Sequence, residues 1–345
     1  MKAEYEDRMM THPSPQVREG GRCVLVGTIV SDQCLQVDLD QIKPGATLMV
    51  DPQRSSLGGN AGRSAATLAA LGIPVILLGD IGTDSRGDGL SNALSRIGVD
   101  TRGLHRHEHL STSTTVSLVH TDGERVLLHD AGANIQTDAS VLGRLSHPLG
   151  PQDILCVSGA RLMPSLSVPG AVTLLQRALE AGAMTVYDTT VKPPGTQKEH
   201  LDHILAVAEI FCTSMGEARA DWSTHDAEET AERLMPQARG WVVVKDGGHG
   251  AVAGHRKSGL WRCAAPKVDV RDTTGAGDNF MAGLIYGLCT GRLLPDALGL
   301  GVACGAASVA AEDDLYKCIT PDQMTTAASR LTTTCITASA VARSI

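Results

Sequence analysis

Six short apolar runs recur along the chain, and segments with helical spacing lie between them. The runs are residues 23–27, 74–78, 154–157, 184–187, 210–212 and 241–244. Each is almost continuously apolar, a pattern typical of a strand that is covered on both faces. Residues 64–71 and 172–179 are the clearest helical segments. This alternation predicts parallel strands joined by crossover helices, and therefore one doubly wound α/β domain.

Two further pairs of short extended runs flank turn signals. The first pair is residues 34–37 and 47–54 around Lys43-Pro44-Gly45, and the second is residues 114–120 and 125–130 around Asp122-Gly123. Pro-Gly and Asp-Gly dipeptides are typical of tight turns between strands. We therefore expect a small sheet that is separate from the main one.

The overall composition limits the class of protein. With 42% hydrophobic residues among 345, the chain can form a sizeable core. The formal net charge of −8, the 3% of aromatic residues and the lack of a Lys/Arg run argue against nucleic-acid binding. No stretch of about eighteen apolar residues occurs, so we expect no membrane partner.

The cysteines and the N-terminus indicate the same compartment. The nine cysteines include no C-x-x-C motif, and an odd number cannot pair completely. Reduced thiols in a cytoplasm fit this pattern. Residues 1–20 are polar and lack the apolar core of a signal peptide. We expect a cytoplasmic protein with a flexible tail over residues 1–20 and one domain over residues 21–345.

A glycine-rich turn near the C-terminal end carries the strongest chemical signal. Residues 267–271 alternate like a short strand, and residues 280–288 have the spacing of a helix. Between them, Gly275 and Gly277 allow a ligand to approach the backbone closely. The first helical turn directs free N–H groups and the positive end of the helix dipole at that ligand. The segment therefore predicts a strand, a turn and a helix that together form an anion hole.

Asp278 lies in the first turn of this helix, beside a site suited to negative charge. This arrangement fits phosphoryl transfer, in which a base takes the proton of the attacking hydroxyl. Alternatively, Asp278 only complements the helix dipole. The position of Phe280 breaks the G-x-G-x-x-G spacing of a Rossmann turn, and no G-K-[ST] follows as in a Walker loop.

The segment Asp272-Thr-Thr-Gly-Ala-Gly-Asp278 resembles the C-terminal signature of the ribokinase-like (PfkB) family of carbohydrate kinases. Further matches run from about residue 27 to about residue 309. The resemblance implies a three-layer α/β/α domain with a mostly parallel sheet and a small β-sheet lid, here about residues 34–57 and 110–130. It also implies ATP-dependent, magnesium-requiring phosphorylation of a primary hydroxyl of a sugar or sugar derivative, and a homodimer formed through the lid.

The resemblance assigns the reacting groups and the sugar site. The anion hole and the general base would be Gly275, Ala276, Gly277 and Asp278. We expect residues 28–32 to continue the first strand to its C-terminal end, where α/β proteins bind ligands. The pattern from Gly27 to Asp32 matches the family's G-x-x-x-x-D, in which the aspartate binds sugar hydroxyls, although an aspartate here could be only a turn residue. The sugar site would also include Gly58, Gly59 and Asn60, although Asn60 could simply cap a helix.

The resemblance also places the metal and the nucleotide. Ser214-Met-Gly-Glu217 is similar to the family's N-x-x-E, with serine in place of asparagine, and implies that Glu217 organises Mg²⁺ through water. A surface glutamate at a helix start is the alternative. The nucleotide side would include Ser214, Lys245, Asp246, Gly247, Gly250 and Thr274, although a plain hairpin turn explains the same glycines.

The family often binds a monovalent cation beside the anion hole. Asp272 and Thr274 match the first part of that site. The later loop at residues 311–315 lacks the usual glycine, which disfavours potassium activation.

Two arginines bear on the acceptor. Arg63 stands where the family usually has asparagine, and a guanidinium requires an anionic partner. The partner could be internal, such as Asp32 or Asp51, or it could be the substrate, because arginine recognises carboxylate and phosphate. Arg161 follows a strand and could lie near the same pocket. If the substrate is the partner of Arg63, the acceptor would be an acidic sugar or a sugar phosphate.

Two other functions stay open from the sequence. A sugar- or nucleotide-sensing regulator without catalysis is favoured by Arg63 and Ser214, and is opposed by the intact Asp278. A nucleoside kinase of the same family is disfavoured by the low aromatic content, because bases usually stack on rings.

Overall fold

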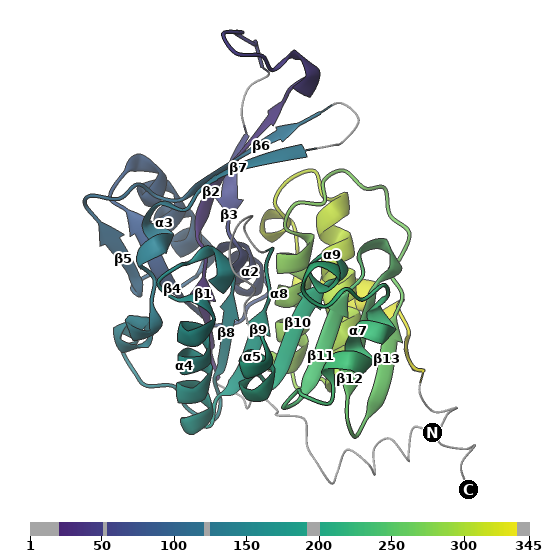
Figure 1. The fold of residues 1–345 in the computed structure, drawn as a ribbon. Coiled ribbons are helices and arrows are strands. Elements are labelled where there is room, and N and C mark those ends of the chain that lie inside the picture. The colour runs from purple at the N-terminus through teal and green to yellow at the C-terminus, as the bar shows by residue number, and fades with distance from the viewer. Residues whose placement is uncertain (1–20, 51–53, 121–124, 192–200, 337–345) are drawn as a thin grey trace, which may run out of the picture.

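A ten-stranded sheet forms the centre of the molecule (Figure 1). The computed structural model describes residues 21–50, 54–120, 125–191 and 201–336, so the predicted tail at residues 1–20 and Asp51 lie outside the described residues. The strand order is β14-β13-β12-β11-β10-β9-β8-β1-β4-β5. The strands from β11 to β5 pair in parallel, and β12, β13 and β14 pair antiparallel. The predicted α/β class with a mostly parallel sheet is confirmed.

The strand bounds follow the apolar runs closely. They are β1 (Cys23–Gly27), β4 (Val75–Gly82), β5 (Leu104–His107), β8 (Ile154–Ser158), β9 (Met184–Asp188), β10 (Ile210–Ser214), β11 (Trp241–Lys245), β12 (Ala251–His255), β13 (Gly259–Cys263) and β14 (Thr333–Cys335). Alternate residues of β1 face opposite layers, so Cys23 and Leu25 join one core and Val24 and Val26 join the other.

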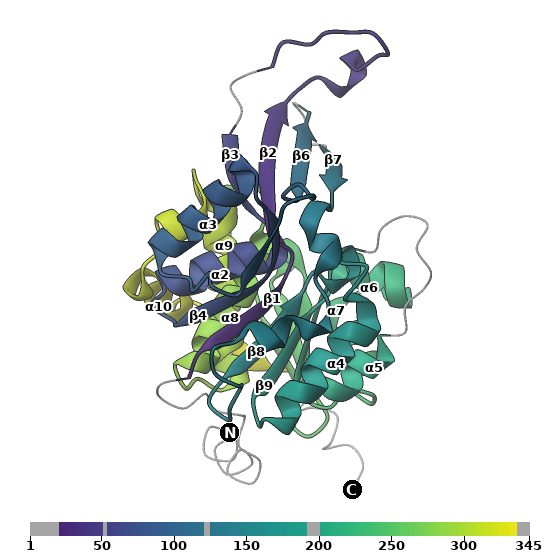
Figure 2. The same ribbon diagram turned by 90° about the vertical axis from the view of Figure 1, so that its left-hand side faces the viewer.

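Helices cover both faces of the main sheet (Figure 2). One layer contains α2 (Asn60–Ala70), α3 (Ser85–Ile97), α8 (Ala276–Cys289), α9 (Leu294–Ala310) and α10 (Pro321–Ser329). The other contains α4 (Ser167–Glu180), α5 (Asp202–Val207), α6 (Met215–Trp222) and α7 (Ala227–Leu234). Short 3₁₀ helices are η1 (Leu39–Gln41), η2 (Gly132–Gln136), η3 (Ala139–Arg144), η4 (Ala160–Leu162), η5 (Gly247–His249) and η6 (Leu315–Lys317). No described helix is both long and apolar enough to span a membrane.

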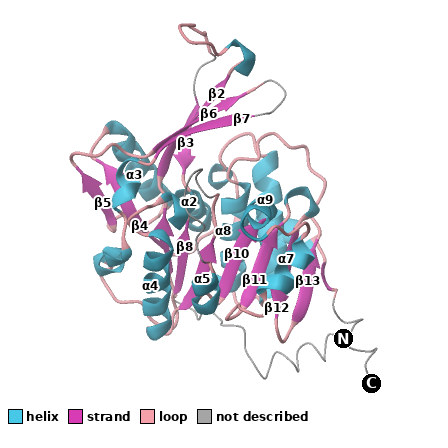
Figure 3. Ribbon diagram, in the orientation of Figure 1, coloured by secondary structure: helices cyan, strands magenta, loops and turns pink. Residues whose placement is uncertain are grey.

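A second sheet of four strands rises beyond the end of β1 (Figures 1 and 3). Its order is β3-β2-β6-β7, with β2 (Val30–Gln36), β3 (Arg54–Gly58), β6 (Thr114–Val119) and β7 (Arg125–Asp130). We call this sheet the lid. Its presence confirms the small sheet predicted from the paired extended runs, and it lies at the carboxyl end of the parallel strands, where ligands of α/β proteins bind.

The structure corrects where the first strand ends. The sequence predicts that β1 continues to Asp32, but the strand ends at Gly27 and Asp32 lies on β2 in the lid. The reason is long-range, because the Asn134 side chain hydrogen-bonds both the N–H and the carbonyl of Ile29. The backbone at Ile29 is thus satisfied outside the main sheet, and the chain turns into the lid.

Two local predictions are wrong. Residues 47–50 form no strand, and the lid strand begins at Arg54 instead. Residues 267–271 are an exposed loop, and no strand among the described residues pairs with it. The helix predicted after the glycine turn is present as α8, and every residue from 279 to 288 is buried because α8 packs against α2 and α9.

Candidate active site

The glycine turn of the signature begins helix α8. Gly275 is its N-cap, with φ 75° and ψ 4°, a left-handed conformation that suits glycine. Among the described residues, none accepts a hydrogen bond from the backbone N–H of Gly277 or Asp278. These donors and the positive end of the helix dipole face the same space. The turn is therefore built to receive an anion.

Helix α2 holds Asp278 in place. The Asn60 amide donates a 2.8 Å hydrogen bond to Asp278 Oδ1, and the Ser64 hydroxyl donates to the Asp278 carbonyl at 2.9 Å. Thr67 donates to the side chain of Asn279 at 2.6 Å. Positions 60, 64 and 67 lie on one face of a helix. This spacing brings the N-terminal turns of two helices together around one carboxylate.

The environment of Asp278 tunes its proton affinity. Burial raises the pKa of Asp278 above its ordinary value, while the Arg63 charge and the Asn60 hydrogen bond act against that rise. The side chain still has some contact with solvent. Asp278 is thus an accessible carboxylate whose proton affinity is greater than that of an aspartate in water.

The residues that are predicted to bind the acceptor sugar lie close together at the N-terminal end of α2. Asp32 accepts a 2.7 Å hydrogen bond from Arg63 Nη2. A Cβ added at Gly58 would lie 2.2 Å from Asp32 Cγ, so only glycine leaves room for that carboxylate. Gly59 is the N-cap of α2 and directly precedes Asn60. The structure therefore brings together Asp32, both glycines, Asn60 and Arg63.

A lid histidine lies on the same side as Asp32. In the strand register, Asp32 is opposite Thr115, and Thr115 is opposite His129 on β7. Directly paired residues share one face of a sheet, so all three face the site. The hydroxyl of Thr115 and Nδ1 of His129 lie 3.0 Å apart, and burial lowers the pKa of His129. The sequence analysis missed His129, although the alternation in residues 125–130 was a usable signal.

Lys245 and Asp188 form an ion pair beside the glycine turn. Lys245 Nζ lies 2.5 Å from Asp188 Oδ1, and a Cβ at Gly277 would lie 3.5 Å from the same Nζ. Burial raises the pKa of Asp188 to about 7, against the opposing charge of Lys245. Burial would lower the pKa of Lys245, but Asp188 and Glu217 outweigh it and raise that pKa. A protonated ammonium therefore borders the anion hole.

Glu217 lies at the start of α6 and is held through one oxygen. Its Oε2 accepts hydrogen bonds from the Thr189 hydroxyl at 2.5 Å and from the Ser214 N–H at 2.8 Å. Ser214 Oγ accepts from the Glu217 N–H, which completes a capping box. No described residue is hydrogen-bonded to Oε1. The carboxylate is fixed and keeps one oxygen for a further ligand.

The remaining predicted nucleotide residues lie in a tight turn. Asp246, Gly247 and Gly250 connect β11 to β12, which pair antiparallel, and the Asp246 N–H donates to the Gly250 carbonyl at 2.8 Å. The hairpin interpretation describes this backbone correctly. The turn directly follows Lys245 in the chain, and its contact with the nucleotide stays a prediction.

Two further predicted residues are held by neighbouring groups. The Arg161 guanidinium forms two hydrogen bonds to Asp221, of 2.7 and 2.8 Å, and its side chain is only 1% exposed. Both oxygens of that carboxylate are therefore engaged in a buried ion pair. Asp272 is exposed and accepts the Thr274 N–H at 2.8 Å, so its carboxylate shapes the turn that precedes Gly275.

Comparison with known protein families decides the class of this site. A model described as pfkB family carbohydrate kinase matches residues 22–319. The chain belongs to this family. It is a pfkB carbohydrate kinase, an ATP-dependent phosphotransferase, as the signature predicted.

Curated relatives act on different sugars. This pfkB kinase is 29% identical over 300 residues to an ATP-dependent ribose-1-phosphate kinase of Halopiger xanaduensis, a match that covers 84% of this chain and 93% of the relative. It is 28% identical over 261 residues to a fructoselysine 6-kinase of Shigella flexneri, covering 73% and 89%. It is 29% identical over 279 residues to the 1-phosphofructokinase of Escherichia coli, covering 78% and 85%.

Solved structures share the fold. Ribokinase of Arabidopsis thaliana, complexed with ribose and ATP, superposes with a TM-score of 0.74 at 20% identity and covers 89% of this chain and 98% of its own. Aminoimidazole riboside kinase of Salmonella enterica gives a TM-score of 0.73 at 22% identity and covers 89% and 100%. The predicted ribokinase-like architecture of the pfkB kinase is confirmed.

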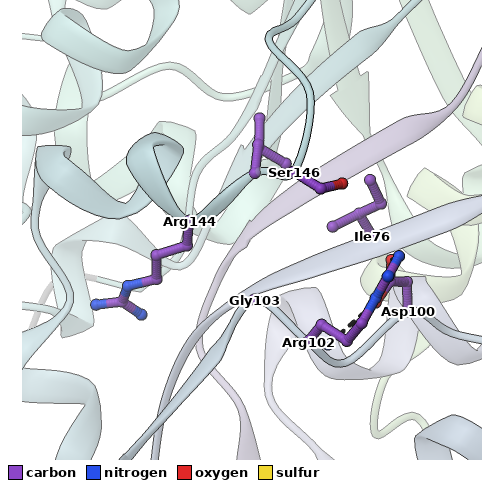
Figure 4. Close-up of a pocket in the computed structure, with 7 residues that line it drawn as sticks. Ile76, Asp100, Arg102, Gly103, Arg144 and Ser146 are labelled. Carbon is purple, nitrogen blue, oxygen red and sulfur yellow. Dashed lines mark hydrogen bonds and ion pairs between the residues drawn. The ribbon is translucent and has the colours of Figure 1, made fainter.

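Two surface hollows differ in size and place. One, near the edge of the main sheet at β4 and β5, has a volume of about 70 Å³, far below the roughly 300–1,000 Å³ of ligand pockets. Figure 4 shows Arg102 against its ion-pair partner Asp100 there, while the Arg144 side chain extends away. The other, of about 440 Å³, lies along the loop before the signature turn and is lined by Lys267, Val268, Asp269, Arg271 and Ala310.

Sequence reasoning missed several residues that shape the site. Asp188 ends a strand, as an aspartate at a ligand-binding edge does, but its role became visible only through its pairing with Lys245. Ser64 and Thr67 had a signal in their helical spacing from Asn60. Asp314 lies in the later loop, 3.9 Å from Arg63, and had no local signal.

Proposed function

We propose that this kinase transfers the γ-phosphate of ATP to a primary hydroxyl of a sugar or sugar derivative, with Asp278 as general base. The observation that carries the proposal is the Asp278 carboxylate, held by Asn60 within the same helical turn whose N–H groups form the anion hole. A base and an electrostatic cradle are the two elements that phosphoryl transfer requires of a protein.

Different groups of the site act on the proton and on the charge of the transferred phosphoryl group. Asp278 accepts the proton of the acceptor hydroxyl, whose oxygen forms a bond to the γ-phosphorus as the bond to the bridging oxygen of ADP breaks. Negative charge on the transferring group then lies beside the N–H groups of Gly277 and Asp278 and the Lys245 ammonium. Preorganised donors of this kind stabilise charge that develops in the transition state.

The donor set near Glu217 fits magnesium. Mg²⁺ prefers oxygen ligands and retains several waters, and Glu217 keeps Oε1 available while Oε2 is held by Thr189 and Ser214. When bound, Mg²⁺ would neutralise phosphate charge. Ser214 serves here by fixing Glu217, so the serine that replaces the usual asparagine is compatible with this role. A monovalent cation at Asp272 and Thr274 remains disfavoured.

The nucleotide and the sugar fit on opposite sides of the turn. The hollow of about 440 Å³ along residues 267–271 has the size of a ligand pocket and lies just before the glycine turn in the chain, so we place the nucleotide there. The sugar would bind under the lid, between Asp32, Gly58 and Asn60. The pairing of Arg161 with Asp221 supports a neutral acceptor rather than an anionic one.

We also propose a homodimer through the outer face of the lid. The face of the lid opposite to Asp32 carries five large apolar side chains beside a few polar ones, and the apolar residues are Leu35, Val116, Leu118, Val126 and Leu128. Val126 is 45% and Leu128 is 55% exposed, which is unusual for side chains of this size on one sheet face. A second copy would cover both. Light scattering should give a dimer for the parent and a monomer for Leu128→Asp, and a monomeric parent would contradict this.

A coupled assay of ATP consumption over a panel of sugars, sugar phosphates and nucleosides tests the function. We expect ATP- and Mg²⁺-dependent phosphorylation of a sugar. Binding of ATP and a sugar by calorimetry without turnover would favour the regulator instead. Preferred phosphorylation of nucleosides would show that the acceptor class is wrong.

A further inference from the structure

Arg63 lies against the anion hole itself. A Cβ added at Gly275 would lie 2.8 Å from Arg63 Nη1 and 2.9 Å from Arg63 Cδ. The guanidinium therefore rests on the backbone of the α8 N-cap, beside the N–H groups that receive the phosphates. Gly275 is required there for this contact as well as for its positive φ.

Two carboxylates hold the guanidinium from opposite elements. Asp32 of the lid accepts a hydrogen bond from Nη2 at 2.7 Å, and Asp314, just before η6, lies 3.9 Å from Nη1. The second distance is too long for a hydrogen bond. The side chain is 12% exposed, so Arg63 has little freedom to move. These contacts fix a positive charge between the acceptor side and the anion hole.

Most donors of this guanidinium have no protein acceptor. An arginine side chain carries five N–H donors. Among the described residues, one acceptor, Asp32 Oδ2, is within hydrogen-bond distance of them. The nitrogens without a protein acceptor keep some contact with solvent, so they can donate to an oxygen-bearing ligand that enters this place. The free edge of the group includes Nη1, which faces Gly275.

We propose that Arg63 donates hydrogen bonds to the phosphoryl group as it passes from ATP to the acceptor. This inference rests on the proposed function and deepens it. In the step, the γ-phosphorus exchanges its bond to the ADP oxygen for a bond to the acceptor oxygen, and the hydroxyl proton moves to Asp278. The planar guanidinium can donate to two phosphoryl oxygens at once. Arg63 would then act beside Lys245, with one cation on each side of the turn.

The same geometry argues against recognition of an anionic acceptor. The Arg63 nitrogen that faces the sugar side is already bonded to Asp32. A second anion at that position would meet the Asp32 carboxylate, and like charges in contact repel each other. A purely structural ion pair is the other alternative. It would explain the contact with Asp32 but not why Nη1 rests on the N-cap of α8 without a hydrogen-bond acceptor.

The test compares Arg63→Asn and Arg63→Lys with Arg102→Asn as the matched control. Arg102→Asn removes an arginine that is 80% exposed and pairs with Asp100 outside the site, and should keep kcat within about threefold. With a neutral acceptor, Arg63→Asn should lose at least about a hundredfold in kcat, the usual effect of removing one transition-state donor. Arg63→Lys keeps the positive charge but lacks the planar set of N–H donors of a guanidinium. Its kcat should therefore fall by an intermediate amount.

A binding measurement separates this role from a structural one. ADP with Mg²⁺, aluminium fluoride and acceptor mimics the transferring phosphoryl group. We expect Arg63→Asn to bind ADP alone as the parent does, but to lose at least about thirtyfold in affinity for the aluminium fluoride complex. Equal weakening of both would overturn the proposal. Added guanidinium should restore part of the kcat of Arg63→Ala, and an absence of rescue at unchanged melting temperature would also contradict it.

Other outcomes are equally decisive. A kcat of Arg63→Asn within about threefold of the parent, with a raised acceptor KM, would assign Arg63 to binding. A loss confined to anionic acceptors would show that it reads the acceptor. If Arg63→Asn and Arg63→Ala do not fold, Arg63→Lys carries the test through its kcat and its aluminium fluoride affinity. Failure of the proposed function is distinguishable, because the parent itself would then phosphorylate no acceptor.

Discussion

The side-chain amide of Asn60 donates a 2.8 Å hydrogen bond to the carboxylate of Asp278, 218 positions later in the chain. The Thr28 hydroxyl donates to the Asn60 carbonyl oxygen at 3.2 Å, which orients the amide so that its nitrogen faces Asp278. The first and last motifs of the family are therefore joined by one amide. This bond fixes the base relative to the acceptor side.

We expect Asp278→Asn to lose at least about a hundredfold in kcat, the typical contribution of a general base. The amide is nearly isosteric and keeps an oxygen for the Asn60 bond, so melting temperature and ADP affinity should stay near those of the parent. Asp296→Asn is a matched control, because Asp296 is an exposed aspartate in the first turn of another helix, α9. Turnover of Asp278→Asn within a few-fold of the parent would exclude Asp278 as the base.

The pH dependence of kcat should report the environment of Asp278. A general base acts in its ionised form, so activity falls as the pH drops through its pKa. Burial raises the pKa of Asp278, and the Asn60 hydrogen bond opposes that rise. Asn60→Ala should therefore move the acid limb of the kcat profile to higher pH. An unchanged limb, or one that moves to lower pH, would contradict this assignment.

The sequence predicted the main sheet well because buried parallel strands carry their signal in every residue. It placed the end of β1 wrongly, since the bonds between Ile29 and Asn134 join positions 105 residues apart. At residues 267–271 the alternation of apolar and polar residues predicted a strand. These residues form an exposed loop, because no described strand lies beside them to pair with. Local patterns thus predicted elements, whereas contacts with distant residues decided their ends.

The same difference between local patterns and long-range contacts applies to the residues of the candidate site. The glycine turn and Asp278 were visible because the motif is contiguous in sequence. Asp188 directly follows the predicted strand at residues 184–187, but its partner Lys245 lies 57 positions later. The placement of Arg161 near the acceptor stays a prediction, and its pairing with Asp221 on α6 could not be seen from the sequence. Pairing between distant charges has no local pattern.

Arg161→Met should destabilise the protein without changing acceptor preference. Removing one partner of a buried ion pair leaves an uncompensated charge and typically costs about 3–5 kcal/mol. Asp221 is that charge, and the pair is 1% and 8% exposed. Urea unfolding gives the free-energy change, and Arg161→Met with Asp221→Leu should recover much of it. A selective loss of activity with anionic acceptors in Arg161→Met would instead place this arginine in the acceptor site.

Lys245→Met should weaken the binding of nucleotide phosphates while leaving the nucleoside unaffected. The ammonium borders the anion hole near Gly277 and stays protonated because Asp188 and Glu217 raise its pKa. A charge-assisted hydrogen bond contributes about 1.5–3 kcal/mol, so ADP affinity should fall at least about tenfold. Calorimetry with ADP and with adenosine measures the two effects separately.

The Asp188 carboxylate complicates this variant, because Lys245→Met leaves it buried without its 2.5 Å partner. Lys245→Met with Asp188→Asn removes both charges and should restore stability while ADP affinity stays low. Lys257→Met, which removes an exposed lysine from the turn between β12 and β13, is the control for loss of one positive charge. If the double variant bound ADP as tightly as the parent, the ammonium would serve the fold alone. If Lys245→Met weakened the binding of adenosine and ADP equally, the variant would have changed the shape of the pocket. The proposed contact between Lys245 and the phosphates would then be contradicted.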